Sequence, residues 1–401
     1  MKVDYIALSI PIFFILIGIE LGYAIYKKLN YYRLNDSLAN LSQGIGSQLV
    51  GIFLKTATFY SYLYIYEHWR FYTFSNSVWT WLLLFIGVDF FYYWFHRLSH
   101  EVNALWAAHI VHHQSEEYNL TVALRQSWFQ SGFAWFFYLP LAFAGFEPIM
   151  FLTVSAFNTL YQFWIHTRLI GNLGPLEWII NTPSHHRVHH GSNPKYIDRN
   201  HGGTLIIWDR LFGTFQKEED EVVYGITKPL ASWNPLWANF HYWAELFQGS
   251  RNALNLKDKI SQFLMPPGWN PAYSGGVQHS GNTQSFQYEK YNPLYNKRFN
   301  IYIIFHFLIT LILASILLFI ADQITRIHLI LCSTLVVVGL TSYGAMMEHK
   351  SWTMKVEYIR LSYWLFLPFI FFWKPFFIAL ITINTILVIF SFFWFNKLNR
   401  Q

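Results

Sequence analysis

Long apolar segments alternate with short polar ones along most of the chain. A membrane-spanning helix needs about 20 mostly apolar residues, so segments of this length predict spans. Gly145, Glu147 and Pro148 mark a turn between the segments 128–146 and 148–165, which predicts that these two segments form a helical pair. The apolar segments are 5–26, 46–66, 78–95, 128–146, 148–165, 300–321, 327–347, 358–373 and 376–395. The pattern predicts an all-α, polytopic membrane helical bundle.

Composition agrees with this class. Hydrophobic residues make up 54% of the chain, aromatic residues 21% and charged residues only 12%. This composition is more hydrophobic and less charged than that of a typical soluble domain. The formal net charge of +6 comes without basic runs interleaved with aromatics, so a nucleic-acid partner is not expected. The single cysteine, Cys332, stands in an apolar segment, and no disulfide framework can form.

Basic residues at the segment ends predict the orientation. Lys27, Lys28 and Arg33 follow the first segment, which places that end in the cytoplasm and the N-terminus on the opposite side. Residues 5–26 lack a basic start and a small-residue cleavage site, so a membrane helix is favoured over a cleaved signal peptide. Counting spans then puts the ends of 78–95 and 148–165 in the cytoplasm, although short apolar runs also fit re-entrant or interfacial helices.

Histidines concentrate after the third apolar segment and again about seventy residues later. Their spacings are i, i+4 and i, i+3, i+4, so each set shares one helix face. Neutral imidazole is the commonest metal ligand, and one ion takes about four to six donors, so eight or more imidazoles predict two ions. Without cysteine among them, iron is favoured, and zinc, copper and manganese stay open. The predicted ligands are His96, His100, His109, His112, His113, His166, His186, His189 and His190.

Acidic residues beside the histidines are candidates for catalysis and for orienting the ligands. Asp89 stands two helical turns before His96, where its carboxylate could accept the second ring N–H of a ligand; pairing with Arg97 is the alternative. Glu101 directly follows His100 and is the second catalytic candidate. His185 points about 100° away from His186 on a helix and ranks below it. Weaker candidates around the site are Glu116, Glu117, Arg125, Gln126, Asp198, Asn200 and His201.

The pattern divides the chain into four parts. They are an N-terminal helix with its flank (1–40), a membrane domain with a cytoplasmic, histidine-rich metal-binding cap (41–247), a connector (248–298) and C-terminal membrane helices (299–401). An all-histidine dinuclear centre at the membrane surface suits oxygen activation beside a lipid. A hydrolase is disfavoured because no nucleophile elbow is present. A metal transporter stays open but is disfavoured, because the histidines gather at helix ends and do not descend through the spans.

The three histidine motifs resemble those of the fatty acid hydroxylase and sterol desaturase superfamily, whose signature is His-x3-His followed by two His-x2-His-His motifs. Within it the resemblance is strongest to the alkylglycerol monooxygenases, also called glyceryl-ether monooxygenases. It covers about residues 40 to 270 and rests on 67–72, 89–126, 181–191 and 206–215.

This resemblance implies two iron ions, which zinc can replace in preparations, with tetrahydrobiopterin and O2 as cosubstrates. The implied reaction hydroxylates the ether-linked carbon of an alkylglycerol, a membrane lipid, and gives an aldehyde and glycerol. Glu101 is the implied pterin contact. The implied location is the endoplasmic reticulum of a eukaryote or the inner membrane of a bacterium. Other members hydroxylate or desaturate sterols and fatty acyl chains with a cytochrome or ferredoxin redox partner, and the sequence does not separate these donors.

Overall fold

The computed structural model describes residues 5–277, 289–293, 296–371 and 377–399, and this part of the chain is helical. Its β pairing is limited to two isolated bridges, Ile180 with Leu205 and Gly191 with Tyr224. The all-α prediction is confirmed. Two compact units form: Met1–Leu230 with Asn239–Lys290, and Ala231–Ala238 with Tyr291–Gln401. The finer division into four parts stays a prediction.

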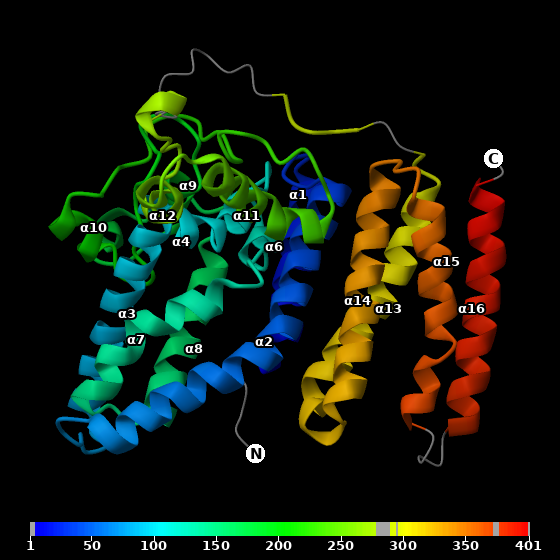
Figure 1. Ribbon diagram of the computed structural model, residues 1–401, viewed down its shortest axis with the longest axis horizontal. Coiled ribbons are helices and arrows are strands. Elements are labelled where there is room, and N and C mark those ends of the chain that lie inside the picture. The colour runs from blue at the N-terminus through cyan, green and yellow to red at the C-terminus, as the bar shows by residue number, and fades with distance from the viewer. Residues whose placement is uncertain (1–4, 278–288, 294–295, 372–376, 400–401) are drawn as a thin grey trace. The chain divides into compact units, whose positions relative to one another are not determined.

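The first unit holds the helices that position the histidines (Figure 1). Its helices are α1 (Tyr5–Tyr26), α2 (Leu34–Trp69), α3 (Val78–Glu101), α4 (Asn103–Ala107), α5 (Ile110–His113), α6 (Leu120–Ala123), α7 (Gln130–Ala144), α8 (Pro148–Trp164), η1 (Gly174–Trp178), α9 (Pro183–His189), α10 (Ile207–Phe212), α12 (Leu256–Leu264) and η2 (Ala272–Ser274). α11 (Pro235–Asn252) begins at the boundary between the units. The second unit contains α13 (Phe299–Ile320), η4 (Ala321–Gln323), α14 (Arg326–Met347), α15 (Thr353–Trp364), η5 (Leu367–Phe371) and α16 (Phe377–Asn399).

Five helices of the described chain are long and apolar enough to cross a membrane, which supports a multi-pass membrane protein. They are Leu8–Tyr26, Val78–Glu101, Phe299–Gln323, Arg326–Met347 and Ile381–Asn399. The other predicted spans contain described helices, but these helices are not among the five. α7 and α8 have 15 and 17 residues, or roughly 22 and 26 Å, less than the hydrocarbon core of about 30 Å.

Two further predicted spans have different bounds from those expected. The segment 46–66 lies inside α2, which has 36 residues and begins at Leu34. The segment 358–373 contains the end of α15, a helix of 12 residues, and the 3-10 helix η5. Its last two residues lie outside the described residues.

An apolar core joins α2, α3, α7 and α8. Leu84 and Val88 of α3 pack in it with Leu141 of α7 and Val154 of α8. All of these core positions on α3 precede His96, so one part of the helix is anchored by packing and its last turns carry histidines. The start of α3 is fixed by Ser77, whose hydroxyl accepts the Thr80 N–H at 3.2 Å.

The turn between α7 and α8 holds this core together. Gly145 ends α7 with φ 106°, and a Cβ there would lie 1.7 Å from the Tyr72 carbonyl oxygen. Only glycine fits both the left-handed backbone and the close approach. Glu147 then caps α8 by accepting the Met150 N–H at 2.9 Å. The predicted helical pair and its turn are confirmed.

Candidate metal centre

The structure brings nine histidines together in two groups near the C-terminal end of α3. Within each group, one ring nitrogen per histidine lies within 4.8 Å of the others. The groups are His96, His100, His109, His113 and His189, and His112, His166, His186 and His190. These nine residues are the predicted metal ligands.

Two short helices divide their neighbouring histidines between the groups. Adjacent residues on a helix point about 100° apart. In α5, His113 joins the first group and His112 the second. At the end of α9, His189 joins the first group and His190 the second. Each His-x2-His-His motif therefore supplies both groups, which the spacing alone does not assign.

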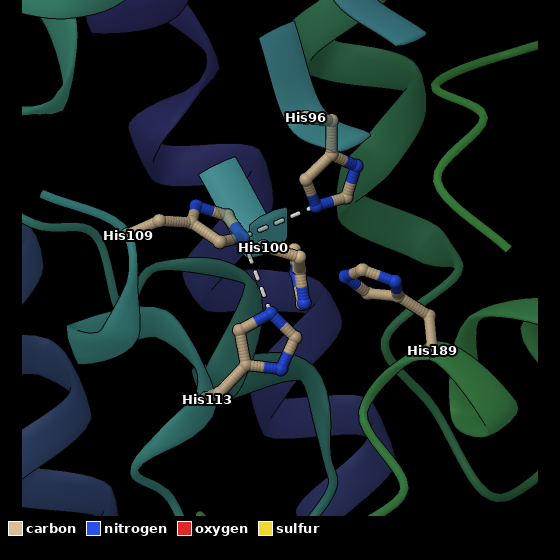
Figure 2. A group of neighbouring side chains, drawn as sticks. All are labelled: His96, His100, His109, His113 and His189. Atoms are coloured by element: carbon tan, nitrogen blue, oxygen red, sulfur yellow. Dashed lines mark hydrogen bonds between the residues drawn. The ribbon is translucent and has the colours of Figure 1, made fainter. Parts of the chain in front are cut away.

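The five rings of the first group point toward one another (Figure 2). The Nε2 atom of His109 lies 3.1 Å from Nε2 of His96 and 3.1 Å from Nε2 of His113. Two nitrogens bound to one ion at about 2.1 Å lie about 3.0 to 3.4 Å apart at octahedral or tetrahedral angles. The observed spacing matches donors that share one ion.

Hydrogen bonds at Nδ1 show which ring nitrogen carries the proton. His96 Nδ1 donates to the backbone oxygen of His201 at 2.8 Å, and His109 Nδ1 donates to Oε1 of Gln130 at 3.1 Å. Carbonyl and amide oxygens only accept, so Nε2 of each neutral ring carries a bare lone pair. Two such lone pairs 3.1 Å apart repel each other unless they share a cation.

The second group repeats this arrangement. His112 Nδ1 donates to the backbone oxygen of Arg125 at 2.7 Å, and His166 Nδ1 donates to that of Gln162 at 2.7 Å. Their Nε2 atoms lie 3.3 Å apart, and Nε2 of His186 lies 3.0 Å from that of His166. Each group thus contains one pair of imidazoles whose bare nitrogens face each other.

Burial favours the neutral, metal-binding form of rings in both groups. All nine are buried. Burial lowers the pKa of His109, His166 and His189 well below the ordinary value, and it lowers the pKa of His112 to about 4. These four rings are therefore neutral imidazoles, and their lone pairs are available to a metal ion.

Several ring nitrogens lack any hydrogen-bond partner in the described part of the chain. They include Nε2 of His100, His189 and His190. Buried polar atoms are almost always paired, and a bound ion would satisfy these. The donor set suits iron, zinc or another first-row transition metal. The two histidine groups therefore indicate a metal site.

Asp89 does not contact a ligand imidazole, which corrects the predicted contact with His96. Its carboxylate accepts the backbone N–H of Thr204 at 2.7 Å and of Leu205 at 3.0 Å. The side chains of Asn158 and Trp208 also donate to it, at 2.7 and 2.9 Å. His96 instead donates its Nδ1 hydrogen to the backbone oxygen of His201 at 2.8 Å.

Asp89 instead fixes the loop that orients His96. This loop contains His201, whose carbonyl accepts the His96 N–H. The Asp209 carboxylate accepts the backbone N–H groups of His201 and Gly202 in the same loop, at 2.7 Å each. Gly203 lets the loop approach, because a Cβ there would lie 2.7 Å from the Tyr92 ring and 3.0 Å from the Asp89 carboxylate. Asp89 acts through the loop on the ligand.

Glu101 lies at the rim of the site. Its side chain is 40% exposed and forms an ion pair with Arg97 Nε at 2.8 Å. The Arg97 guanidinium also lies 5.5 Å from the Trp94 ring. No contact in the described part of the chain joins Glu101 to a histidine of the two groups.

The weaker candidates around the histidines have varied positions. Asp198 Oδ1 lies 3.2 Å from His100 Nδ1 and so orients a ligand. His201 is fully buried beside the first group, with its ring centroid 5.0 Å from that of His100 and both ring nitrogens unpartnered among the described residues. The Asn200 side-chain amide donates to the backbone oxygens of His185 and Gln216. His185 lies outside both groups and 3.8 Å from Glu177, as its lower rank predicted.

Further candidates belong to buried polar networks. Glu117 pairs with Arg33, Arg168 and Lys290 at 2.8, 3.1 and 2.6 Å, and Glu116 pairs with Arg33 at 3.1 Å. Both carboxylates therefore lie in ion pairs inside the protein.

Arg125 supports the centre through its backbone and its side chain. Its carbonyl holds His112, and its guanidinium Nε donates to the Val111 carbonyl at 2.6 Å. The Gln126 side chain donates to the Ala123 carbonyl at 3.2 Å. Gln130 and Gln162 were not predicted, although they hold His109 and His166; Gln162 stands four residues before His166, which was the one available signal.

The comparisons with known proteins agree with this site. The fatty acid hydroxylase family model matches residues 81–214, which contain all nine histidines. An alkylglycerol monooxygenase from Xenopus tropicalis is 41% identical over 372 residues, 91% of this chain and 82% of that protein. The alkylglycerol monooxygenase of Homo sapiens is 38% identical over 367 residues, with the same two coverages of 91% and 82%.

A more distant match covers a shorter part of the chain. An ornithine lipid hydroxylase from Rhizobium tropici is 32% identical over 128 residues, 32% of this chain and 39% of that protein. No solved structure matches the chain. Because the long matches span most of both proteins and the histidine motifs lie inside the family domain, the chain belongs to the alkylglycerol monooxygenase family of fatty acid hydroxylase-type membrane oxidoreductases.

Proposed function

We propose that this chain is a membrane di-iron monooxygenase that hydroxylates the ether-linked carbon of an alkylglycerol, with O2 as oxidant and tetrahydrobiopterin as electron donor. The hydroxylated carbon carries two oxygens and breaks down to a fatty aldehyde and free glycerol. The observation that supports this most is the pair of buried histidine groups, each with facing Nε2 lone pairs 3.1 or 3.3 Å apart. Long relatives named alkylglycerol monooxygenase support the substrate class.

The chain would hold one ion in each histidine group. Iron bound there would supply the reduction of O2 and the oxidation of the C–H bond. The backbone oxygens of His201, Arg125 and Gln162 keep three ligands in the tautomer that presents Nε2. Neutral imidazoles leave the charge of the ions uncancelled, and their burial keeps bulk water from the reacting atoms.

The rim of the site offers a place for a reduced pterin. Glu101 is exposed enough to accept hydrogen bonds from an amino-pyrimidine edge, and Arg97 fixes its carboxylate. Trp106 lies against the first group, with its ring centroid 5.0 Å from His100 and 5.5 Å from His113. A flat ring bound between Glu101 and Trp106 would stand close to the ions. Asp89 has a positioning role in this proposal.

The lipid would enter from the bilayer. Apolar side chains of α3 are exposed over the turns before the ligands, among them Trp79, Leu83 and Ile86. They would guide an alkyl chain along the helix that ends at His96 and His100. We place the histidines on the cytoplasmic side, from the basic residues after α1. The membrane would be the endoplasmic reticulum in a eukaryote or the inner membrane in a bacterium.

Turnover of purified protein in lipid nanodiscs tests this function. With an alkylglycerol, tetrahydrobiopterin and O2, we expect aldehyde release; with the matching ester-linked glyceride, no aldehyde should form. Replacing His109, His112 and His113 by alanine should abolish turnover. The partial match to an ornithine lipid hydroxylase keeps a second function in view. This second function is the hydroxylation or desaturation of a sterol or fatty acyl lipid with a ferredoxin or cytochrome donor. If the protein shows this activity and releases no aldehyde from the ether lipid, the first proposal is refuted and the second is supported.

A further inference from the structure

A second cluster of buried polar residues lies far from any histidine ligand in the sequence, in the second unit. Glu357 and Arg360 stand one turn apart on α15 and are both 0% exposed. Arg360 Nε donates to Glu357 Oε2 at 2.8 Å, and its Nη2 donates to Oε1. α15 packs with α13 and α14, two candidate membrane spans. An ion pair inside apolar helices is costly, and such groups usually mark a function.

The carboxylate of this pair is fully used. Besides the two bonds from Arg360, it accepts the Tyr302 hydroxyl of α13 and the Ser342 hydroxyl of α14, the latter at 2.7 Å. Four donors saturate a carboxylate. Glu357 therefore anchors the cluster and leaves no oxygen for another molecule.

Other polar atoms of the cluster are not satisfied. Arg360 Nη1 is buried and has no hydrogen-bond partner among the described residues, and the same holds for both ring nitrogens of His306 on α13. His306 is 0% exposed. Buried nitrogens without partners are rare in folded proteins, because each has given up its bonds to water.

Arg360 and His306 border the same small region. The Arg360 guanidinium carbon lies 4.9 Å from the Trp364 ring centroid, and the His306 ring lies 5.9 Å from that of Trp364. Tyr343 lies beside both: its ring centroid is 5.4 Å from the guanidinium, and its hydroxyl donates to the His306 backbone oxygen at 3.1 Å. The Arg360 guanidinium and the His306 ring therefore both lie beside Trp364 and Tyr343, among α13, α14 and α15.

The chemistry of these atoms points to an uncharged ligand with hydroxyl groups. The charges of Glu357 and Arg360 cancel, so a buried anion would find no free countercharge. Nη1 offers two N–H donors, and a neutral His306 offers one donor and one acceptor. A hydroxyl accepts and donates at once, and two neighbouring hydroxyls can serve both residues.

We propose that Arg360 and His306 bind the diol headgroup of a neutral lipid, a glycerol that carries one chain. The ligand would come from the bilayer, because α13 exposes apolar side chains at Ile301, Leu308 and Ile312. This site belongs to the second unit and does not depend on the reaction proposed for the histidine groups.

Photolabelling of the full-length protein in phosphatidylcholine nanodiscs tests the site. The probe is a monoalkylglycerol with a diazirine in the chain next to the headgroup, and labelled peptides are mapped by mass spectrometry. Wild type should be labelled within 299–364, and unlabelled monoglyceride should compete. His306→Phe removes both ring nitrogens but keeps an aromatic ring, and Arg360→Lys keeps a cation for Glu357 but removes Nη1. Each should reduce this labelling about tenfold or more.

Ile330→Phe, at an exposed position of α14, is the matched control and should leave the labelling unchanged. Three results would overturn the proposal: equal labelling by a probe whose hydroxyls are methylated, stronger labelling by a fatty-acid probe, or full labelling of both variants. If a variant fails to fold, the comparison of probe headgroups on wild type decides. Labelling of 89–190 and aldehyde release are read separately, so failure of the proposed function is distinguishable from failure of this site.

Discussion

His96 and His109 face each other through Nε2 atoms 3.1 Å apart, while each donates its Nδ1 hydrogen to an oxygen. His112 and His166 do the same at 3.3 Å. The oxygens at Nδ1 are therefore as much part of the centre as the rings, because they decide which nitrogen is free to bind.

Gln130→Leu removes the oxygen that holds His109. The ring can then carry its proton on Nε2, so we expect metal affinity to fall about 10- to 100-fold, as measured by competition with a chelator. Gln126→Leu is the matched control, since that amide donates to the backbone carbonyl of Ala123, three residues earlier in the chain. Equal metal retention by both variants would show that Gln130 does not set the tautomer.

Asp89→Asn should destabilise the protein without removing a ligand. The new amide NH2 would face backbone N–H groups of the loop, and the cost is about 1–3 kcal/mol in the free energy of unfolding, read as a shift in thermal unfolding. Asp322→Asn, at an exposed position in η4, should change stability by less than about 0.5 kcal/mol. Unchanged stability with lost activity would mean that Asp89 acts on the reacting molecules directly.

Glu101→Gln should impair pterin use and spare the metals. The amide keeps the shape but loses the charge that strengthens hydrogen bonds to the amino-pyrimidine edge, so KM for the pterin should rise about tenfold. Glu245→Gln, which breaks another exposed ion pair, with Lys228, is the control. Loss of metal from Glu101→Gln would place this residue among the ligands and would end the pterin assignment.

Opposite ends of α3 should lie on opposite sides of the membrane. Ser75 precedes the helix, and Ser192 follows the histidines of α9. A cysteine at Ser75 should react with an impermeant reagent added outside intact cells, and one at Ser192 should react only after permeabilisation. The native Cys332 is buried and gives little background. Equal labelling of both positions from outside would contradict the proposed orientation.

Local patterns in the sequence were enough to predict which histidines come together. Spacings of three and four residues place side chains on one helix face whatever the rest of the chain does, and all nine predicted ligands lie in the two groups. The sequence alone could not predict that neighbours such as His112 and His113 belong to different groups, because this depends on the three-dimensional fold. The partners of Asp89 could not be predicted either, because Thr204 is 115 residues away in the chain.

The sequence pattern predicted a helix from residue 46, but α2 begins at Leu34. Contacts with residues distant in the chain explain this difference too. The first turns of α2 are polar and resemble a loop, yet Asp36 and Asn40 are buried. Asp36 accepts the Ser115 hydroxyl at 2.8 Å, and Asn40 accepts a bond from Arg125 at 3.1 Å. These long-range bonds satisfy the polar side chains inside the protein, and no property of residues 34–45 alone predicts them.

The metal content of wild type and three single variants of α9 tests the central claim most directly. After dialysis against a weak chelator, wild type and His185→Gln should retain about two transition-metal ions per chain. His189→Gln, which changes the first group, and His186→Gln, which changes the second, should each retain about one. One ion in wild type, or two ions in both His186→Gln and His189→Gln, would contradict a centre of two histidine groups.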